Sequence, residues 1–97
     1  MKVPELHPNA TKELIESAQY LNEATPGLGD RFLDDFFKVL KRIGKYPESG
    51  FRISGGVRGA KISVFRYDVI YRLEQSRIYI IAIAHQRRKP GYWRGRI

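Results

Sequence analysis

The sequence contains no cysteine, which excludes disulfide bonds and thiolate zinc sites. This absence suits the reducing cytoplasm better than secretion. The N-terminus has no apolar signal-peptide core, and no apolar run approaches the length that crosses a membrane. The most apolar run, residues 78–84, suits a buried strand. We therefore predict a cytoplasmic protein without a membrane partner, folded as a single domain over residues 1–97.

Acidic residues are scarce in the second half of the chain. Residues 51–97 contain eleven Lys and Arg but only two acids, Asp68 and Glu74, for a net charge of +9. Residues 1–50 have a net charge of −1, so the total of +8 comes entirely from the second half. This asymmetry favours an anionic partner, either a nucleic acid or an acidic protein segment, over a merely solvated surface.

Histidine is also scarce, and motifs typical of metal or cofactor sites are missing. His7 and His85 are far apart in the sequence, and Asp34 and Asp35 are consecutive on an expected helix and so point in different directions. The sequence has neither a glycine-rich phosphate loop followed by Lys and Ser or Thr nor a nucleophile elbow. It therefore predicts no metal site and no cofactor.

Two amphipathic helices are expected in the first half of the chain. Within residues 9–23, Leu14, Ala18 and Leu21 recur at helical spacing. The segment TPGLGD breaks this pattern, and a second helix with a wide apolar face runs to about Gly44. Helices joined by such a short break form an antiparallel hairpin, whose apolar faces need a flat surface to cover.

From Phe51 onward the apolar period changes to two, which is typical of strands. A hairpin turn is expected at EQSR, residues 74–77. The expected strands cover residues 61–65, 68–73 and 78–84, with a short first strand within residues 3–8 at one edge.

The last of these strands is apolar on both faces, so we expect it at the centre of the sheet. The small side chains of Ala82 and Ala84 are expected to let the helices approach closely. The predicted fold is α+β: an N-terminal helical hairpin packed on a small antiparallel β-sheet, followed by a short C-terminal helix or coil.

The stretch AHQRRKPGYWRGR, residues 84–96, contains five basic residues, a His, a Tyr and a Trp, but no acid. Strand alternation places His85 on the same face as Ile81 and Ile83. We therefore expect a basic concave patch at one end of the sheet. Its expected lining also includes Arg87, either Lys61 or Arg66 from a neighbouring strand, and a rim of Tyr92 and Trp93.

Four segments, GLGDRFLDDF, RIGKYPESG, VFRYDVIYRL and IAIAHQRRKPGYWRGR, occur in this order. Together they resemble the RelE/ParE superfamily of bacterial toxins from type II toxin–antitoxin modules, often called plasmid stabilisation proteins. The sequence looks closest to the ParE-like members. The resemblance implies a compact toxin, neutralised by a tightly bound antitoxin, on the fold predicted above. One departure is Arg66, where relatives often carry Pro, and it predicts a straighter strand.

The resemblance implies two alternative cellular targets. ParE-like members poison DNA gyrase and have no known chemistry of their own, whereas RelE-like members cleave messenger RNA in the ribosomal A site. We expect a gyrase-inhibiting toxin. The alternative is a RelE-like, metal-independent, ribosome-dependent mRNA endonuclease, so the sequence leaves open whether the chain is an enzyme. A third class is a non-toxic nucleic-acid-binding module, because basic stretches with interleaved aromatics suit single strands.

Metal-free RNA cleavage needs an acid, a base and cations around the reacting phosphate. His85 could serve as acid or base, because its side chain titrates near neutrality. The sequence places no acidic residue near it, however, and a structural role is favoured. The candidates for a nuclease site are His85, Arg87, Arg88, Tyr92, Lys61 and Arg66.

A gyrase poison needs only a stable scaffold with a distinctive surface, and Trp, Tyr and Arg are the usual anchors of protein interfaces. The candidates for contact with the target or with nucleic acid are Arg87, Arg88, Lys89, Tyr92, Trp93, Arg94 and Arg96. The alternative for the two rings is that they pack back on the sheet as a hydrophobic lid. The expected partners are DNA gyrase and a ParD-like antitoxin, bound in a hetero-oligomer. The antitoxin is expected to lay an amphipathic helix on the helical hairpin and an extended segment near the sheet.

Overall fold

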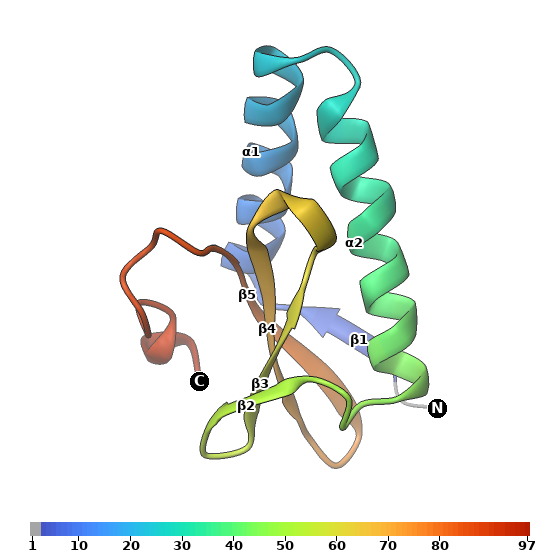
Figure 1. Ribbon diagram of the computed structural model, residues 1–97. Coiled ribbons are helices and arrows are strands. Elements are labelled where there is room, and N and C mark those ends of the chain that lie inside the picture. Colours follow the sequence, from blue (N-terminus) through green and yellow to red (C-terminus); the bar gives the residue numbers. More distant parts are fainter. Residues whose placement is uncertain (1–2) are drawn as a thin grey trace.

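The computed structural model describes residues 3–97 and shows two helices packed on a five-stranded sheet, which confirms the α+β prediction. The helices stand side by side as a hairpin (Figure 1). The helices are α1 (Pro8–Ala24) and α2 (Leu28–Lys45), and the strands are β1 (Val3–Leu6), β2 (Phe51–Ser54), β3 (Val57–Lys61), β4 (Tyr67–Leu73) and β5 (Arg77–His85). Within the described residues, neither helix has an apolar span that could cross a bilayer.

The strand order is β1-β5-β4-β3-β2, so β5 lies inside the sheet, as its apolar sequence predicts. The neighbouring pairs are antiparallel except β1 with β5, which is parallel. The sheet is therefore mixed rather than wholly antiparallel. The parallel pairing is possible because the helical hairpin and three strands separate β1 from β5, far more than the dozen residues that such a connection needs.

The tip of the helical hairpin is held by a short contact between its two helices. Asn22 Oδ1 accepts a hydrogen bond of 2.7 Å from the Gly29 N–H, and Asn22 Nδ2 donates to Asp30 Oδ1 at 3.3 Å. A Cβ at Gly29 would overlap the carbonyl oxygen of Ala18, so glycine is what lets α2 begin so close to α1.

The main core lies between the helical hairpin and one face of the sheet. Its members include Leu14, Ala18, Phe32, Phe36, Ile43, Val69, Tyr71, Ile78, Ile80 and Ile83. Tyr71 is fully buried, and its hydroxyl donates to the Pro47 carbonyl at 2.9 Å while accepting the Gly50 N–H at 3.0 Å. These two bonds fix the loop between α2 and β2 to the centre of the sheet.

Strand β5 contains a bulge at Ile81. Ile70 pairs with Ala82, and the next residue of β4, Tyr71, pairs with Ile80, so Ile81 is an extra residue on β5. An extra residue reverses the alternation of the side chains that follow it. The residues of β5 in the helix-facing core are therefore Ile78 and Ile80 before the bulge and Ile83 after it.

The bulge corrects the predicted facing of β5. Ala82 and Ala84 belong to a second buried cluster with Trp93, on the side away from the helical hairpin. The prediction that these alanines lie under the helices is wrong, because it assumed unbroken alternation. His85 lies on the same face of β5 as Ile83, as expected, but not on the face of Ile81.

The segment between β3 and β4 is a turn rather than the end of a strand. Its centre is a short 3₁₀ turn, Ser63–Phe65. Ser63 has a φ of 34° and Arg66 a φ of 59°, and such positive values do not occur in strands. The predictions of a strand over residues 61–65 and of a straighter strand at Arg66 are wrong, because the chain reverses direction here.

Candidate functional site

The C-terminal segment, residues 86–97, folds back over the sheet face that the helices leave uncovered. Trp93 anchors it and is only 4% exposed. The indole belongs to a buried cluster with Val57 and Ile70, next to the two alanines of β5. The segment ends in a 3₁₀ turn, Arg94–Arg96, where a short helix or coil was expected. Of the two alternatives for Trp93, packing onto the sheet as a lid is the one observed.

A second anchor is Glu13 on α1, a residue that the sequence did not single out. Its carboxylate receives two hydrogen bonds of 2.9 Å from the Arg96 guanidinium, Nη1 to Oε1 and Nη2 to Oε2. The Tyr92 hydroxyl also donates to Oε2, at 2.8 Å. One carboxylate thus binds two side chains of the C-terminal segment to the first helix, and we call this contact the Glu13 clasp.

The Glu13 clasp also completes the edge of β5. Strand β1 pairs with β5 only as far as Ile80. Beyond that point, Arg96 Nη1 donates to the Ile81 carbonyl at 3.1 Å, and the Ile83 N–H donates to Glu13 Oε1 at 3.1 Å. The clasp therefore satisfies backbone groups that a longer β1 would otherwise have paired.

The electrostatics of the Glu13 clasp follow from these contacts. Burial by itself raises the pKa of the Glu13 carboxyl, but hydrogen bonds from Arg96, Tyr92 and the Ile83 N–H outweigh it, so the pKa lies below the ordinary value. Burial and the Glu13 carboxylate raise the pKa of the Tyr92 hydroxyl. Glu13 is thus held as the anion and Tyr92 as a neutral donor.

The basic residues of the C-terminal segment do not share one rim. Arg88 stacks on the Tyr92 ring, with its guanidinium carbon 3.9 Å from the ring centroid. Arg94 lies over the Trp93 ring at 4.9 Å and donates to Ser54 Oγ at 3.1 Å, near the end of β2. Arg96 is turned toward α1 in the Glu13 clasp. Two other basic side chains, Arg87 and Lys89, are exposed in the turn after β5.

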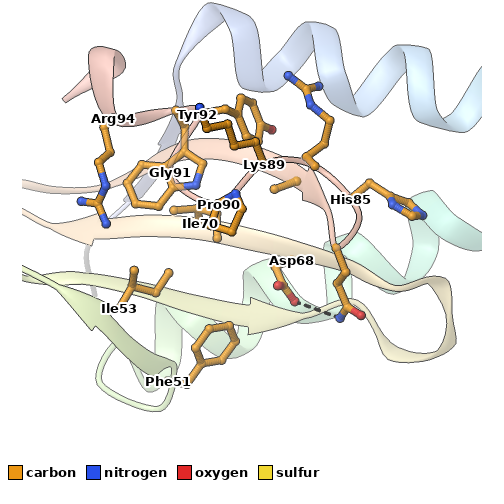
Figure 2. A pocket seen from close by; sticks show the side chains of 14 residues that line it. Phe51, Ile53, Asp68, Ile70, His85, Lys89, Pro90, Gly91, Tyr92 and Arg94 are labelled. Carbon is orange, nitrogen blue, oxygen red and sulfur yellow. Dashed lines mark hydrogen bonds between the residues drawn. The ribbon is translucent and has the colours of Figure 1, made fainter.

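His85 lies at the end of β5 and packs against the core. Its ring stands edge-on to Tyr67, with the ring centroids 4.9 Å apart. Its Nδ1 accepts a hydrogen bond of 3.0 Å from the Arg87 N–H. In Figure 2 the ring points away from Asp68. Among the described residues, then, a tyrosine ring and a backbone amide hold His85, and no carboxylate orients it.

Lys61 and Arg66 lie at the same end of the sheet as His85. The Gln86 N–H donates to the Arg66 carbonyl at 2.9 Å, which places the turn before β4 beside the end of β5. Lys61 is opposite Asp68 in the β3–β4 register. With Arg87 and Lys89, this end of the molecule carries four of the predicted basic residues.

A pocket of about 210 Å³ opens between the C-terminal segment and the uncovered face of the sheet (Figure 2). Phe51 and Ile53 of β2 form one side and Pro90 and Trp93 the other. Asp68 lies in its lining, and Gln86 Nε2 donates to its Oδ1 at 3.5 Å. Burial raises the pKa of Asp68, whereas the Gln86 hydrogen bond and the charge of Lys61 lower it in part.

The sequence did not identify Glu13 or Asp68 as site residues, for different reasons. Glu13 lies on the same helix as the exposed acids Glu16 and Glu23, and 83 residues separate it from Arg96. Asp68 carried one signal, because it is one of only two acids in a strongly basic half of the chain. Among residues 3–97, no group of three or more His, Asp or Glu side chains is placed to hold a metal ion.

Comparisons with known proteins agree with this fold. The family model that matches is described as ParE toxin of type II toxin–antitoxin system, parDE, and it covers residues 5–90. A solved structure described as a chromosomal ParDE toxin–antitoxin system from P. aeruginosa superposes with a TM-score of 0.76 at 16% identity, over 88% of this chain and 96% of that one. No curated protein matches the sequence.

The family match spans the helical hairpin, strands β2 to β5 and the last two residues of β1. It stops at Pro90, before Trp93 and the part of the Glu13 clasp that the C-terminal segment supplies. The extent of the match nevertheless shows that this chain belongs to the ParE toxin family of type II toxin–antitoxin systems.

Proposed function

We propose that this chain is a toxin that inhibits DNA gyrase and is neutralised by a cognate antitoxin. Membership of the ParE toxin family supports the toxin role. The geometry of the C-terminal segment is the reason for proposing gyrase as the target. Trp93 and the Glu13 clasp hold this segment in one conformation, while Arg87 and Lys89 project from it into solvent. A preorganised surface with exposed cations suits a binder of a large protein–DNA complex, because little conformational freedom is lost on binding.

The nuclease alternative has less support from the geometry. Acid–base catalysis needs two groups that can exchange protons at neutral pH. The Tyr92 hydroxyl already donates to Glu13, and its pKa is raised, so its proton is held firmly. His85 accepts a backbone hydrogen bond and packs on Tyr67, which is typical of a structural histidine.

An apolar stripe on α2 supports the antitoxin part of the proposal. Phe37 is 57% exposed, and Leu33 and Leu40, at positions i−4 and i+3, are only partly buried. Residues at these spacings lie next to one another on a helix surface. Such a stripe fits the apolar face of a partner helix, and acids on that partner would offset the charge of +8.

Purified gyrase provides the direct test of the target. The chain should block supercoiling of relaxed plasmid and induce the DNA-damage response in cells, while messenger RNA in translating extracts stays intact. His85→Ala should inhibit as strongly as the unaltered chain. Messenger cleavage that depends on His85, with supercoiling unaffected, would instead establish the endonuclease alternative.

A pair of charge variants tests the surface itself. Arg87→Ala combined with Lys89→Ala should raise the concentration needed to inhibit gyrase. The control is Arg31→Ala combined with Lys41→Ala, which removes the same charge from exposed sites on α2. Equal inhibition by both double variants would show that the C-terminal segment does not contact the target.

The antitoxin surface has its own test. The small protein encoded beside this gene should bind the unaltered chain tightly, and Phe37→Asp should weaken that binding without changing gyrase inhibition. Val64→Asp is a matched control, because Val64 is 71% exposed in the turn between β3 and β4. Similar losses of binding for both variants would assign the antitoxin to another surface.

A further inference from the structure

The pocket beside the C-terminal segment combines apolar walls with one half-buried carboxylate, that of Asp68. The Phe51 ring packs directly on Gly59, which has no side chain. Phe51 is 44% exposed, on the open face of the sheet. The volume of about 210 Å³ corresponds to roughly seven water molecules at ~30 Å³ each. That is room for a single flat ring system.

The charges around the pocket restrict what can enter it. Among the described residues that line it, Arg88, Lys89 and Arg94 are basic and Asp68 is the only acid. A cationic side chain would meet three positive charges before reaching Asp68. The complementary ligand therefore has an anionic group for the basic residues and a neutral ring with hydrogen-bond donors for the carboxylate.

We propose that this pocket binds the guanine base of a nucleotide, with Asp68 accepting hydrogen bonds from the base and the neighbouring basic residues contacting its phosphate. An ionised carboxylate only accepts, and its two oxygens match two parallel donors. Guanine offers two adjacent donors, N1–H and the N2 amino group, on one edge. In adenine and cytosine a ring acceptor lies beside the single amino group, and this acceptor would face the carboxylate.

The structure gives Asp68 room for this role. Among the described residues, its hydrogen-bond partner is Gln86, at a distance of 3.5 Å that marks the long limit of such a bond. Gln86 is exposed, so a base can displace its amide at little cost. The Phe51 ring offers a face on which the base can stack, an interaction that tolerates any base and leaves the choice of guanine to Asp68.

Trp93 provides the readout, because it is the only tryptophan in the sequence and it lines the pocket. Titration of the full chain with GMP should change its tryptophan fluorescence in a saturable way. AMP and UMP should bind roughly ten- to a hundredfold more weakly. IMP, which lacks the N2 amino group, should fall between GMP and AMP.

Asp68→Asn should reduce GMP affinity roughly ten- to a hundredfold, because an amide cannot accept two hydrogen bonds side by side. Asp34→Asn removes the same charge from an exposed site on α2 and should leave binding unchanged. Thermal unfolding checks that both variants are folded. If Asp68→Asn is not, the ranking of GMP, IMP and AMP on the unaltered chain decides the matter.

The same titration distinguishes the source of the base. A single-stranded pentanucleotide with one central guanosine should bind more tightly than GMP if the natural ligand is a strand, and with similar affinity if it is a free nucleotide. Equal affinity for GMP, AMP and UMP, or no saturable change at millimolar concentrations, overturns the proposal. So does a response to a basic peptide without a response to GMP.

This inference does not depend on the proposed gyrase target. A chain that fails to inhibit gyrase but ranks GMP above AMP retains the guanine site. A chain that inhibits gyrase but binds all nucleotides alike loses it.

Discussion

Removal of the Glu13 clasp should destabilise the whole protein. The side chains of Arg96 and Glu13 are only 16% and 14% exposed, and the carboxylate accepts four hydrogen bonds. Glu13→Ala leaves the Arg96 guanidinium, the Tyr92 hydroxyl and the Ile83 N–H without this acceptor. Arg96→Ala is milder, because Tyr92 and Ile83 still donate to the carboxylate.

The expected magnitude follows from the burial of the pair. Removing one partner of a buried ion pair costs about 3–5 kcal/mol, and the lower end applies because both side chains retain some contact with solvent. We therefore expect a loss of about 3 kcal/mol for Glu13→Ala and about 2 kcal/mol for Arg96→Ala. At a urea m-value of about 1.5 kcal/mol/M, the first loss lowers the unfolding midpoint by about 2 M.

Urea unfolding followed by circular dichroism measures these losses, and the Trp93 fluorescence reports on the C-terminal segment. The double variant should be little less stable than Glu13→Ala alone, because both changes remove the same contact. Glu16→Ala, an exposed carboxylate on α1, is the control and should change stability by less than about 0.5 kcal/mol. Strictly additive losses, or a Glu13→Ala loss as small as that of the control, would refute the clasp.

The same contact predicts a pH dependence. The pKa of Glu13 is lowered on folding, so its stabilisation is present above the ordinary value of 4.5 and disappears as the pH falls through the folded value. The difference in unfolding midpoint between the unaltered chain and Glu13→Ala should therefore be large at pH 7 and small in strong acid. A difference that does not change with pH would contradict the ionic nature of the contact.

Three further substitutions test the packing. Gly29→Ala should cost about 1–3 kcal/mol because the new methyl group meets the backbone of α1, whereas Gly95→Ala, with open space around it, should be nearly neutral in urea unfolding. Tyr71→Phe should cost about 1–3 kcal/mol by leaving two backbone groups of the loop after α2 unpaired, and faster amide exchange in that loop should accompany the loss. Trp93→Ala should cost about 3–5 kcal/mol by thermal unfolding followed by circular dichroism, and a near-neutral result would show that the C-terminal segment is not docked in solution.

The helices and the interior position of β5 could be predicted because their signals are local. The pattern over residues 9–23 matches α1 (Pro8–Ala24) closely, since helical periodicity repeats within a few residues. The position of β5 followed from its apolar residues on both faces. The turn at EQSR is also confirmed, by the hydrogen bond from the Glu74 N–H to the Arg77 carbonyl.

The rest depends on contacts between distant residues. The bulge at Ile81 and the turn before Arg66 could not be seen in the sequence. Both lie in segments where apolar residues still alternate, so the sequence there looks like an unbroken strand. The burial of Trp93 could not be decided from the sequence, since the same ring suits a lid or an interface. The partner of Arg96 lies on the first helix, and no local pattern connects the two.

The closure of the β5 edge by side chains has a consequence for the behaviour of the protein at high concentration. Unpaired N–H and C=O groups along a strand are templates on which another molecule can add a strand of its own. A chain shortened to end before Arg96 would uncover the Ile81 carbonyl, whereas the Ile83 N–H would keep its acceptor on Glu13. We therefore expect a chain without Arg96 to aggregate more readily at high concentration, an effect separate from any contact that the other arginines make with a target.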